Sequence, residues 1–247
     1  LVPALGGQVF LYLPPTRLSH RMAWLMACAF GMSGSYALGI LSHGFPALAL
    51  PLLVVITTVV MMICRFYAVP PPGSLFFVMA AAIGAFSPVT GRDALAQVGA
   101  FTLGSVLALA VAFVYSLHIV SRRGVPQPTP NPEPEFDFVV LDSLVIGAFV
   151  GLSLLVAMLL HVDRPYWVPV SCLAVIQGAS LRAVWTRQLH RIVGTSVGLL
   201  LFLAVAKLPL NLWAIAGLIT ALTFIIETLV VRHYALATVF IKPLALL

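Results

Sequence analysis

The chain has 247 residues, of which 62% are hydrophobic and 8% are charged, with a net charge of +6. Soluble domains carry about 25% charged residues, so a water-soluble domain of this size is excluded because too few charges would cover its surface. The excess of basic residues does not indicate a nucleic-acid partner, since the charges stand between apolar runs rather than on one soluble face. The composition therefore predicts a polytopic membrane protein.

Long apolar segments follow one another along the chain, separated by short polar or Pro/Gly breaks. A membrane-spanning helix needs about 20 mostly apolar residues. Nine candidate spans cover residues 20–41, 45–64, 73–90, 96–120, 139–161, 165–181, 188–206, 211–230 and 234–247. Leu, Ala and Val run continuously, without the alternation of a membrane barrel, so we expect an all-α transmembrane helix bundle.

One stretch, residues 121–138, cannot span a bilayer. It reads SRRGVPQPTPNPEPEFDF and holds five prolines, two adjacent arginines and three acidic residues. Proline at every second position favours an extended, polyproline-like linker. It divides the chain into a first transmembrane part, 1–120, and a second, 139–247.

Two short motifs occur twice. TRLSHR at 16–21 returns as TRQLHR at 186–191, an offset of 170, and CRFYAV at 64–69 resembles VRHYAL at 231–236, an offset of 167. Nearly equal offsets predict a duplicated unit. Aligning the halves gives two parallel six-helix repeats, the first lacking its first two helices and the second its last, so both ends look cut from something longer.

The basic residues predict the orientation. With Arg17 placed inside and the spans alternating, nine of the 13 Lys and Arg residues fall in inside loops, three in outside loops and Lys242 within a segment. The positive-inside rule then puts both hexapeptides and the linker in the cytoplasm.

Each basic hexapeptide opens a helix. Arg187 and Arg191 are four residues apart and share a face, as do Arg17 and Arg21. Such arginines at a cytoplasmic mouth would attract anions and bind carboxylates through two hydrogen bonds. The alternative is that they reach lipid phosphates and fix the topology.

Aromatic and ionisable residues supply further candidates. Tyr166 and Trp167 begin a helix on the outer side, where they form either an interfacial aromatic belt or the wall of a substrate exit. Lys242 lies in an apolar segment and precedes a proline that breaks its helix, so it could neutralise a substrate carboxylate or pair with Glu227. Thr195, in the small-residue run GTSVG, could offer a hydroxyl to a ligand, although packing explains the glycines.

Asp142 is a third ionisable residue in an apolar segment. It and Glu227 stand a few residues from the inner interface, which their side chains could reach.

No pattern typical of an enzyme occurs in the sequence. Three isolated cysteines make neither a disulfide framework nor a zinc site, the six histidines are scattered, and no phosphate-cradling glycine loop occurs. We therefore expect no enzymatic activity, no metal and no cofactor. Transport would be ion-coupled, passive or powered by another subunit.

The order of motifs in the second half resembles the fusaric acid resistance family of bacterial inner-membrane proteins. An outer PYW helix is followed by RQLHRIVGTSVG and then by two helices joined by RHYA, over residues 139–247. The first half departs from this pattern, with Trp24 and Leu25 where Gly194 and Thr195 stand. It is therefore expected to be a diverged copy with a structural role.

The resemblance implies export of small organic acid anions, chiefly aromatic carboxylates, with a homo-oligomer or an accessory efflux subunit as possible partners besides the lipid bilayer. Plant aluminium-activated malate channels look similar in helix plan, so an anion channel remains an alternative. A non-transporting membrane scaffold is the other.

Overall fold

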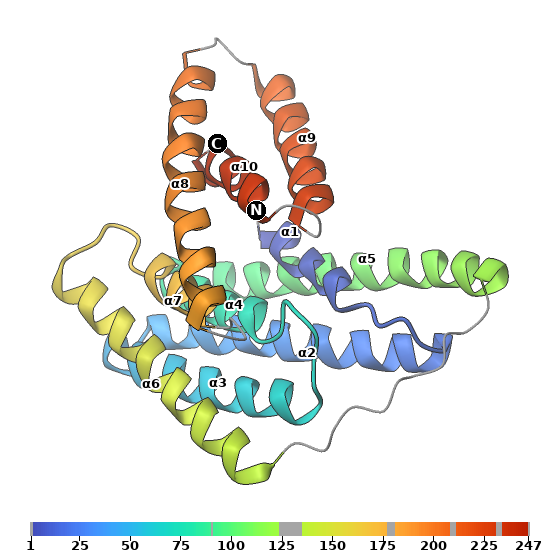
Figure 1. Cartoon of the computed structure of the whole chain (residues 1–247), viewed down its shortest axis with the longest axis horizontal. Coiled ribbons are helices and arrows are strands. Elements are labelled where there is room, and N and C mark those ends of the chain that lie inside the picture. The colour runs from blue at the N-terminus through green and yellow to red at the C-terminus, as the bar shows by residue number, and fades with distance from the viewer. Residues whose placement is uncertain are drawn as a thin grey trace. The chain divides into compact units, whose positions relative to one another are not determined.

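The computed structural model describes residues 2–89, 91–123, 135–176, 181–207, 211–230 and 234–246. All regular secondary structure of these residues is helical (Figure 1), which confirms the prediction of an all-α protein. The chain divides into two compact units, unit 1 over Leu1–Ala174 and unit 2 over Val175–Leu247.

The helices succeed one another with short connections. In unit 1 they are α1 (Val2–Gly7), the 3-10 helix η1 (Gln8–Tyr12), α2 (Leu18–His43), α3 (Pro46–Phe66), α4 (Leu75–Ala85), α5 (Gly91–Arg123), α6 (Phe136–Leu159) and most of α7 (Trp167–Ile176). Unit 2 contains α8 (Leu181–Val205), α9 (Leu212–Val230) and α10 (Tyr234–Leu246).

Four helices of the described chain are long and apolar enough to cross a membrane. They are Leu18–His43, Ala47–Phe66, Gly91–Ile119 and Phe136–Leu159. Within the described residues, shorter apolar helices cover Leu75–Ala85, Trp167–Ile176, Ile192–Ala204 and Ala214–Ile226. Helix α4 follows the turn PPPG and has 11 residues.

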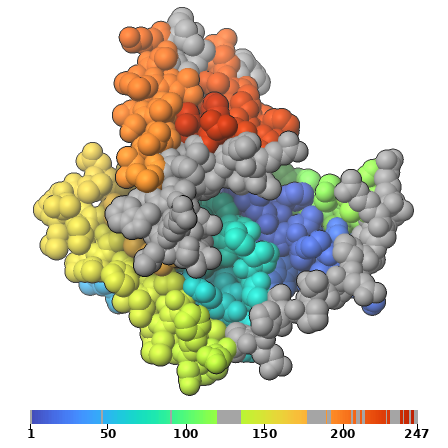
Figure 2. All heavy atoms as spheres, in the orientation of Figure 1, coloured from blue at the N-terminus to red at the C-terminus, as the bar shows by residue number. Residues whose placement is uncertain are grey.

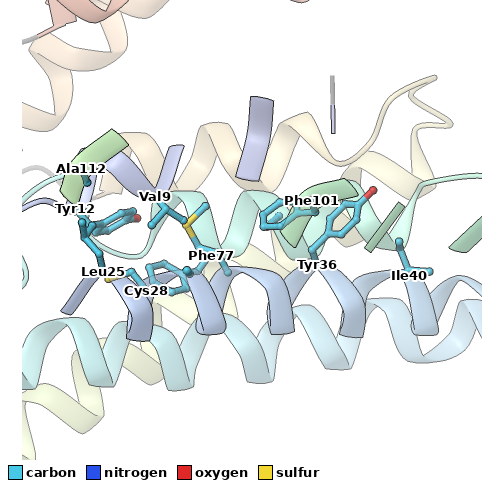
Figure 3. Packing of buried hydrophobic residues seen from close by; sticks show 12 residues of the cluster. Val9, Tyr12, Leu25, Cys28, Tyr36, Ile40, Phe77, Phe101 and Ala112 are labelled. Atoms are coloured by element: carbon cyan, nitrogen blue, oxygen red, sulfur yellow. The ribbon is translucent and has the colours of Figure 1, made fainter. Parts of the chain in front are cut away.

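Helix α2 is the centre of unit 1, in contact with α3, α4, α5 and η1. Its buried side chains meet those of α4 and α5 in one apolar cluster (Figure 3). Within this cluster Tyr36 of α2 stacks on Phe101 of α5, with ring centroids 4.8 Å apart and an interplanar angle of 15°. Both rings are fully buried, so the stack holds α5 against α2.

The crossing of α2 and α4 depends on two glycines. A Cβ at Gly39 would meet the carbonyl oxygen of Ala81, and a Cβ at Gly84 would meet that of Tyr36. The two backbones therefore approach more closely than larger residues allow, as small residues permit in membrane helix pairs.

The sequence predicted no element before residue 20, yet α1 and η1 form there and lie along α5. The Ser105 hydroxyl donates to the Gly6 carbonyl at 3.1 Å, and a Cβ at Gly104 would meet the carbonyl oxygen of Pro3. Val9 and Tyr12 are buried by this packing. The apolar stretch is too short for a span, which is why a search for 20-residue segments missed it.

Helix α6 packs on α3. A Cβ at Gly147 would meet Oγ1 of Thr58, and one at Gly151 would meet a methyl group of Val54. These contacts join α6 to unit 1, and the division between the two compact units falls after residue 174. The linker at 121–138 stays a prediction. The two parallel repeats stay a prediction.

The packing of three helices is alike in the two units. In unit 1, α4 contacts both α2 and α3, and in unit 2, α10 contacts both α8 and α9. In unit 1 α2 also contacts α3, whereas α8 and α9 share little or no contact, so the duplication stays a prediction.

Large apolar side chains are exposed along α5 and α6. In the space-filling view α6 lies at the edge of unit 1 with its outer side chains uncovered (Figure 2). Leu103 and Val114 on α5 are 70% and 67% exposed, and Leu159 on α6 is 68% exposed. Such surfaces are unfavourable in water and favourable against lipid tails, so these spans contact the lipid bilayer.

Candidate functional site

Four helix ends meet at what we call the basic end of unit 1, where α2 and α6 begin and α3 and α5 finish. Three contacts join them: Arg21 with Ser116, Trp24 with Tyr67, and Arg65 with Asp142. The arginines of these stretches are Arg17, Arg21, Arg65, Arg122 and Arg123, against Arg92 and Arg164 near the opposite helix ends.

Arg21 is a buried cation of this end, with 4% of its surface exposed. Its Nε donates to the carbonyl oxygen of Thr16 at 2.7 Å, and its Nη1 donates to Oγ of Ser116 at 3.5 Å. Both acceptors are neutral, and no described carboxylate forms an ion pair with Arg21. A buried charge without a counter-charge is costly, so the site favours an anion beside the guanidinium.

Arg17 lies one turn earlier and is exposed. It is the N-cap residue of α2, makes no side-chain capping hydrogen bond, and no acidic residue occupies the first turn. The first backbone N–H groups of a helix have no partner within the helix and carry partial positive charge. The start of α2 therefore combines two arginines with a helix N-terminus that lacks a side-chain cap.

A histidine and two aromatic residues support the start of α2. Nδ1 of His20 lies 2.9 Å from Oγ1 of Thr16, and its ring stacks on Trp24 with centroids 5.9 Å apart. Trp24 meets Tyr67, the C-cap residue of α3, edge-on at 6.3 Å. These contacts position the first turn of α2 and explain why histidine occurs with the arginines.

Tyr166 and Trp167 lie at the other end of unit 1. Their rings are 5.6 Å apart and both side chains are half-buried. Tyr166 also meets Phe86, the C-cap residue of α4, at 6.3 Å. The sequence analysis missed Phe86, because nothing in an apolar run marks which phenylalanine faces a distant loop.

The unit 2 candidates lie on all three of its helices. Thr195 of α8 is half-buried beside the buried Gly194. Arg187 and Arg191 on α8, Glu227 on α9 and Lys242 on α10 have backbones within the described helices, and their side chains lie outside the described ones.

Ser116 is the other partner that sequence reasoning missed. It is a fully buried serine within the apolar run AFVYSLHI of α5. The one sign of this contact in the sequence is a single hydroxyl inside a spanning segment, which is too weak to identify the partner of Arg21. Among the described residues, no group of three or more His, Cys, Asp or Glu side chains could hold a metal ion.

Comparison with known proteins finds a family that resembles the second part of the chain. Residues 147–247 match the family model described as fusaric acid resistance protein-like. This match confirms the resemblance predicted from the motifs, and the family is associated with membrane transport rather than catalysis. It indicates a multi-pass, transporter-like membrane protein.

A curated relative is the uncharacterized membrane protein YvaC of Bacillus subtilis (strain 168), which is 37% identical over 83 residues. The aligned segment is 34% of this chain and 13% of the relative. No solved structure matches the chain at a significant level.

Proposed function

We propose that the protein exports small organic acid anions across the bacterial inner membrane, with aromatic carboxylates as the main class. The observation that carries the proposal is the family match over residues 147–247, which includes Arg187, Arg191 and Thr195. The two arginines at the start of α2, whose first turn holds no acidic residue, support an anion rather than a cation as the transported species.

The residues take separate roles along the path. Arg187 and Arg191 receive the carboxylate at the cytoplasmic mouth, because a guanidinium binds a carboxylate through two parallel hydrogen bonds. Arg17 and Arg21 add positive potential on the same side.

The deeper residues act after entry. Thr195 and Lys242 contact the anion within the membrane, and Glu227 pairs with Lys242 when no substrate is bound. Tyr166 and Trp167 line the exit, where their rings stack on an aromatic acid.

The direction of transport agrees with the membrane potential. Moving one negative charge outward is favoured by about 2.3 kcal/mol per 100 mV when the inside is negative. An anion therefore needs no pump to leave, and a second copy of the chain or an accessory efflux subunit would complete the path.

The test uses the full-length protein in cells loaded with benzoate or succinate. The double variant Arg187→Ala, Arg191→Ala is expected to lower benzoate efflux at least about tenfold at unchanged abundance, since two charged hydrogen-bond donors are lost. The matched control is Arg92→Ala, an exposed arginine near the opposite end of unit 1, and should export normally.

Normal benzoate efflux from the double variant at wild-type abundance would refute the exporter. Single-channel current without saturation of the flux would instead identify an anion channel.

A further inference from the structure

Three aromatic rings meet at the end of unit 1 opposite the basic end. The ring centroid of Phe86, the C-cap residue of α4, lies 6.3 Å from that of Tyr166, and the Tyr166 centroid lies 5.6 Å from that of Trp167. The ring planes of the two pairs are tilted by 35° and 37°, and all three side chains are half-buried. Each ring therefore keeps part of its surface uncovered. We call these three residues the outer aromatic cluster.

A polar contact begins at the residue that follows Phe86 in the chain. Ser87 donates a hydrogen bond to Oε1 of Gln97 at 3.1 Å, and the fully buried Tyr36 donates to the same oxygen at 2.8 Å. Two hydroxyl donors therefore fix the direction in which the Gln97 amide points. Among the described residues, none accepts a hydrogen bond from Nε2 of Gln97, whose side chain is half-buried. The amide thus has two N–H donors to offer a ligand.

The aromatic cluster and the amide belong to the same end of unit 1. Helices α2 and α4 run in the same direction, because a Cβ at Gly31 would meet the ring of Phe77 and a Cβ at Gly39 would meet the carbonyl oxygen of Ala81. Both helices therefore finish at this end, and Gln97 lies in the second turn of α5, which begins there.

We propose that the outer aromatic cluster and Gln97 form an exit subsite that binds an aromatic carboxylate as it leaves the protein. The ring of the acid packs on the cluster through edge-on or offset contacts, which an aliphatic acid cannot make. Its carboxylate accepts hydrogen bonds from Nε2 of Gln97. This inference rests on the proposed export of aromatic acids, and it adds Phe86 and Gln97 as the residues that select them.

An interfacial belt accounts for only part of this arrangement. Belt residues need only lie at the level of the headgroups, whereas Phe86 at the end of α4 contacts Tyr166, which precedes α7 and lies 80 residues away in the chain. A belt also gives no reason for an amide beside it that is held with both of its N–H groups unused.

Binding at the exit subsite is weaker than binding at the arginines. The amide is neutral, and hydrogen bonds from neutral donors are weaker than those from a guanidinium. Asp93 stands four residues before Gln97 on the same helix and is exposed, so its carboxylate opposes a second negative charge at this place. A weak site favours release of the acid on this side.

The aromatic part is tested in cells that contain the full-length protein and are loaded with benzoate or cyclohexanecarboxylate, which has the same charge but no aromatic ring. The wild type should export benzoate about three- to tenfold faster, as ring contacts predict. Phe86→Leu should lower this ratio at least about twofold. The matched control, Phe45→Leu, should keep the ratio, because Phe45 is an exposed phenylalanine at the same end and outside the cluster.

The polar part is tested by Gln97→Glu, which keeps an acceptor for Tyr36 and Ser87. It should lower benzoate export about tenfold, because two donors are replaced by a negative charge. Ala96→Glu adds the same charge at the neighbouring, exposed position and should export normally. Immunoblotting gives the abundance of each variant. The export ratio of Phe86→Leu does not depend on abundance, so it decides if the Gln97 variant does not fold.

Three outcomes would overturn the exit subsite and leave the exporter intact. They are equal export of the two acids by the wild type, an unchanged ratio in Phe86→Leu, and equal losses in Gln97→Glu and Ala96→Glu. Absence of benzoate efflux from the wild type would instead refute the exporter, and the subsite with it.

Discussion

Nη2 of Arg65 lies 2.6 Å from Oδ2 of Asp142, which joins the end of α3 to the start of α6. The side chains are 40% and 25% exposed. The carboxylate oxygen is buried without a well-aligned hydrogen bond, so the contact is an ion pair by distance. The ion pair therefore gives Asp142 a partner. From the sequence, Asp142 was expected either to be functional or to reach the interface, and it lies just beyond the predicted linker.

Removing the Asp142 charge should lower stability. Asp142→Ala leaves Arg65 without its counter-charge, and a double-mutant cycle of Asp142→Ala with Arg65→Ala should give a coupling of about 1 kcal/mol, at the upper end for partly exposed pairs. Thermal unfolding in detergent, followed by tryptophan fluorescence, measures it. Additive single effects would show that the pair contributes nothing.

The tight crossing of α2 and α4 makes a second prediction. Gly39→Ala should destabilise the protein by about 1–3 kcal/mol, because its Cβ would meet the Ala81 carbonyl and the helices would have to separate. Gly34→Ala in the same helix is the matched control, since nothing lies within 4 Å of its Cβ position. The control should be neutral or up to about 1 kcal/mol stabilising, as alanine favours helix. Equal unfolding midpoints for the two variants would contradict this crossing.

A buried hydroxyl links α2 to α5. Tyr36 donates to Oε1 of Gln97 at 2.8 Å, and Ser87 donates to the same oxygen at 3.1 Å. Tyr36→Phe should therefore cost about 1 kcal/mol of unfolding free energy. Tyr115→Phe removes a half-exposed hydroxyl and should leave the unfolding midpoint unchanged. A larger loss in the control would mean that the Tyr36 bond is not the stabilising one.

The aromatic cluster tests substrate preference. If Trp167 contacts the substrate, Trp167→Leu should lower benzoate efflux several-fold, about the 1 kcal/mol expected of a ring contact, and should spare succinate. Phe66→Leu is the control, an exposed aromatic residue at the other end of unit 1. Equal losses for both acids would place Trp167 in the interfacial belt.

Lys242 separates two explanations of a charge in an apolar helix. Lys242→Met should abolish efflux at wild-type abundance if the ammonium group contacts the substrate. Reduced abundance of the protein, restored by adding Glu227→Gln, would show instead that the lysine pairs with the glutamate. Quantitative immunoblotting beside the efflux assay distinguishes these results.

Much of the fold follows from composition. Few charges and long apolar runs predict helices in a membrane, because buried backbone groups must bond within their own segment. The motifs around Arg187 and Tyr166 were enough to indicate the family that residues 147–247 match. The sequence did not predict the short helices α1 and η1, since an apolar stretch as short as Val2–Tyr12 does not differ from a loop on hydropathy alone.

The sequence by itself determined the class of protein, the approximate positions of the longer helices, and the clustering of arginines near certain helix ends. Hydropathy and charge are local quantities, so one chain suffices to state them. Only the tertiary structure decided that Arg21 is buried against Ser116 and that Asp142 meets Arg65. It alone also shows that Gly39 lies where α2 crosses α4, whereas Gly34 of the same helix has no close neighbour. Which face of an apolar helix packs and which faces lipid depends on residues far away in the chain, because lipid tails and side chains are equally apolar.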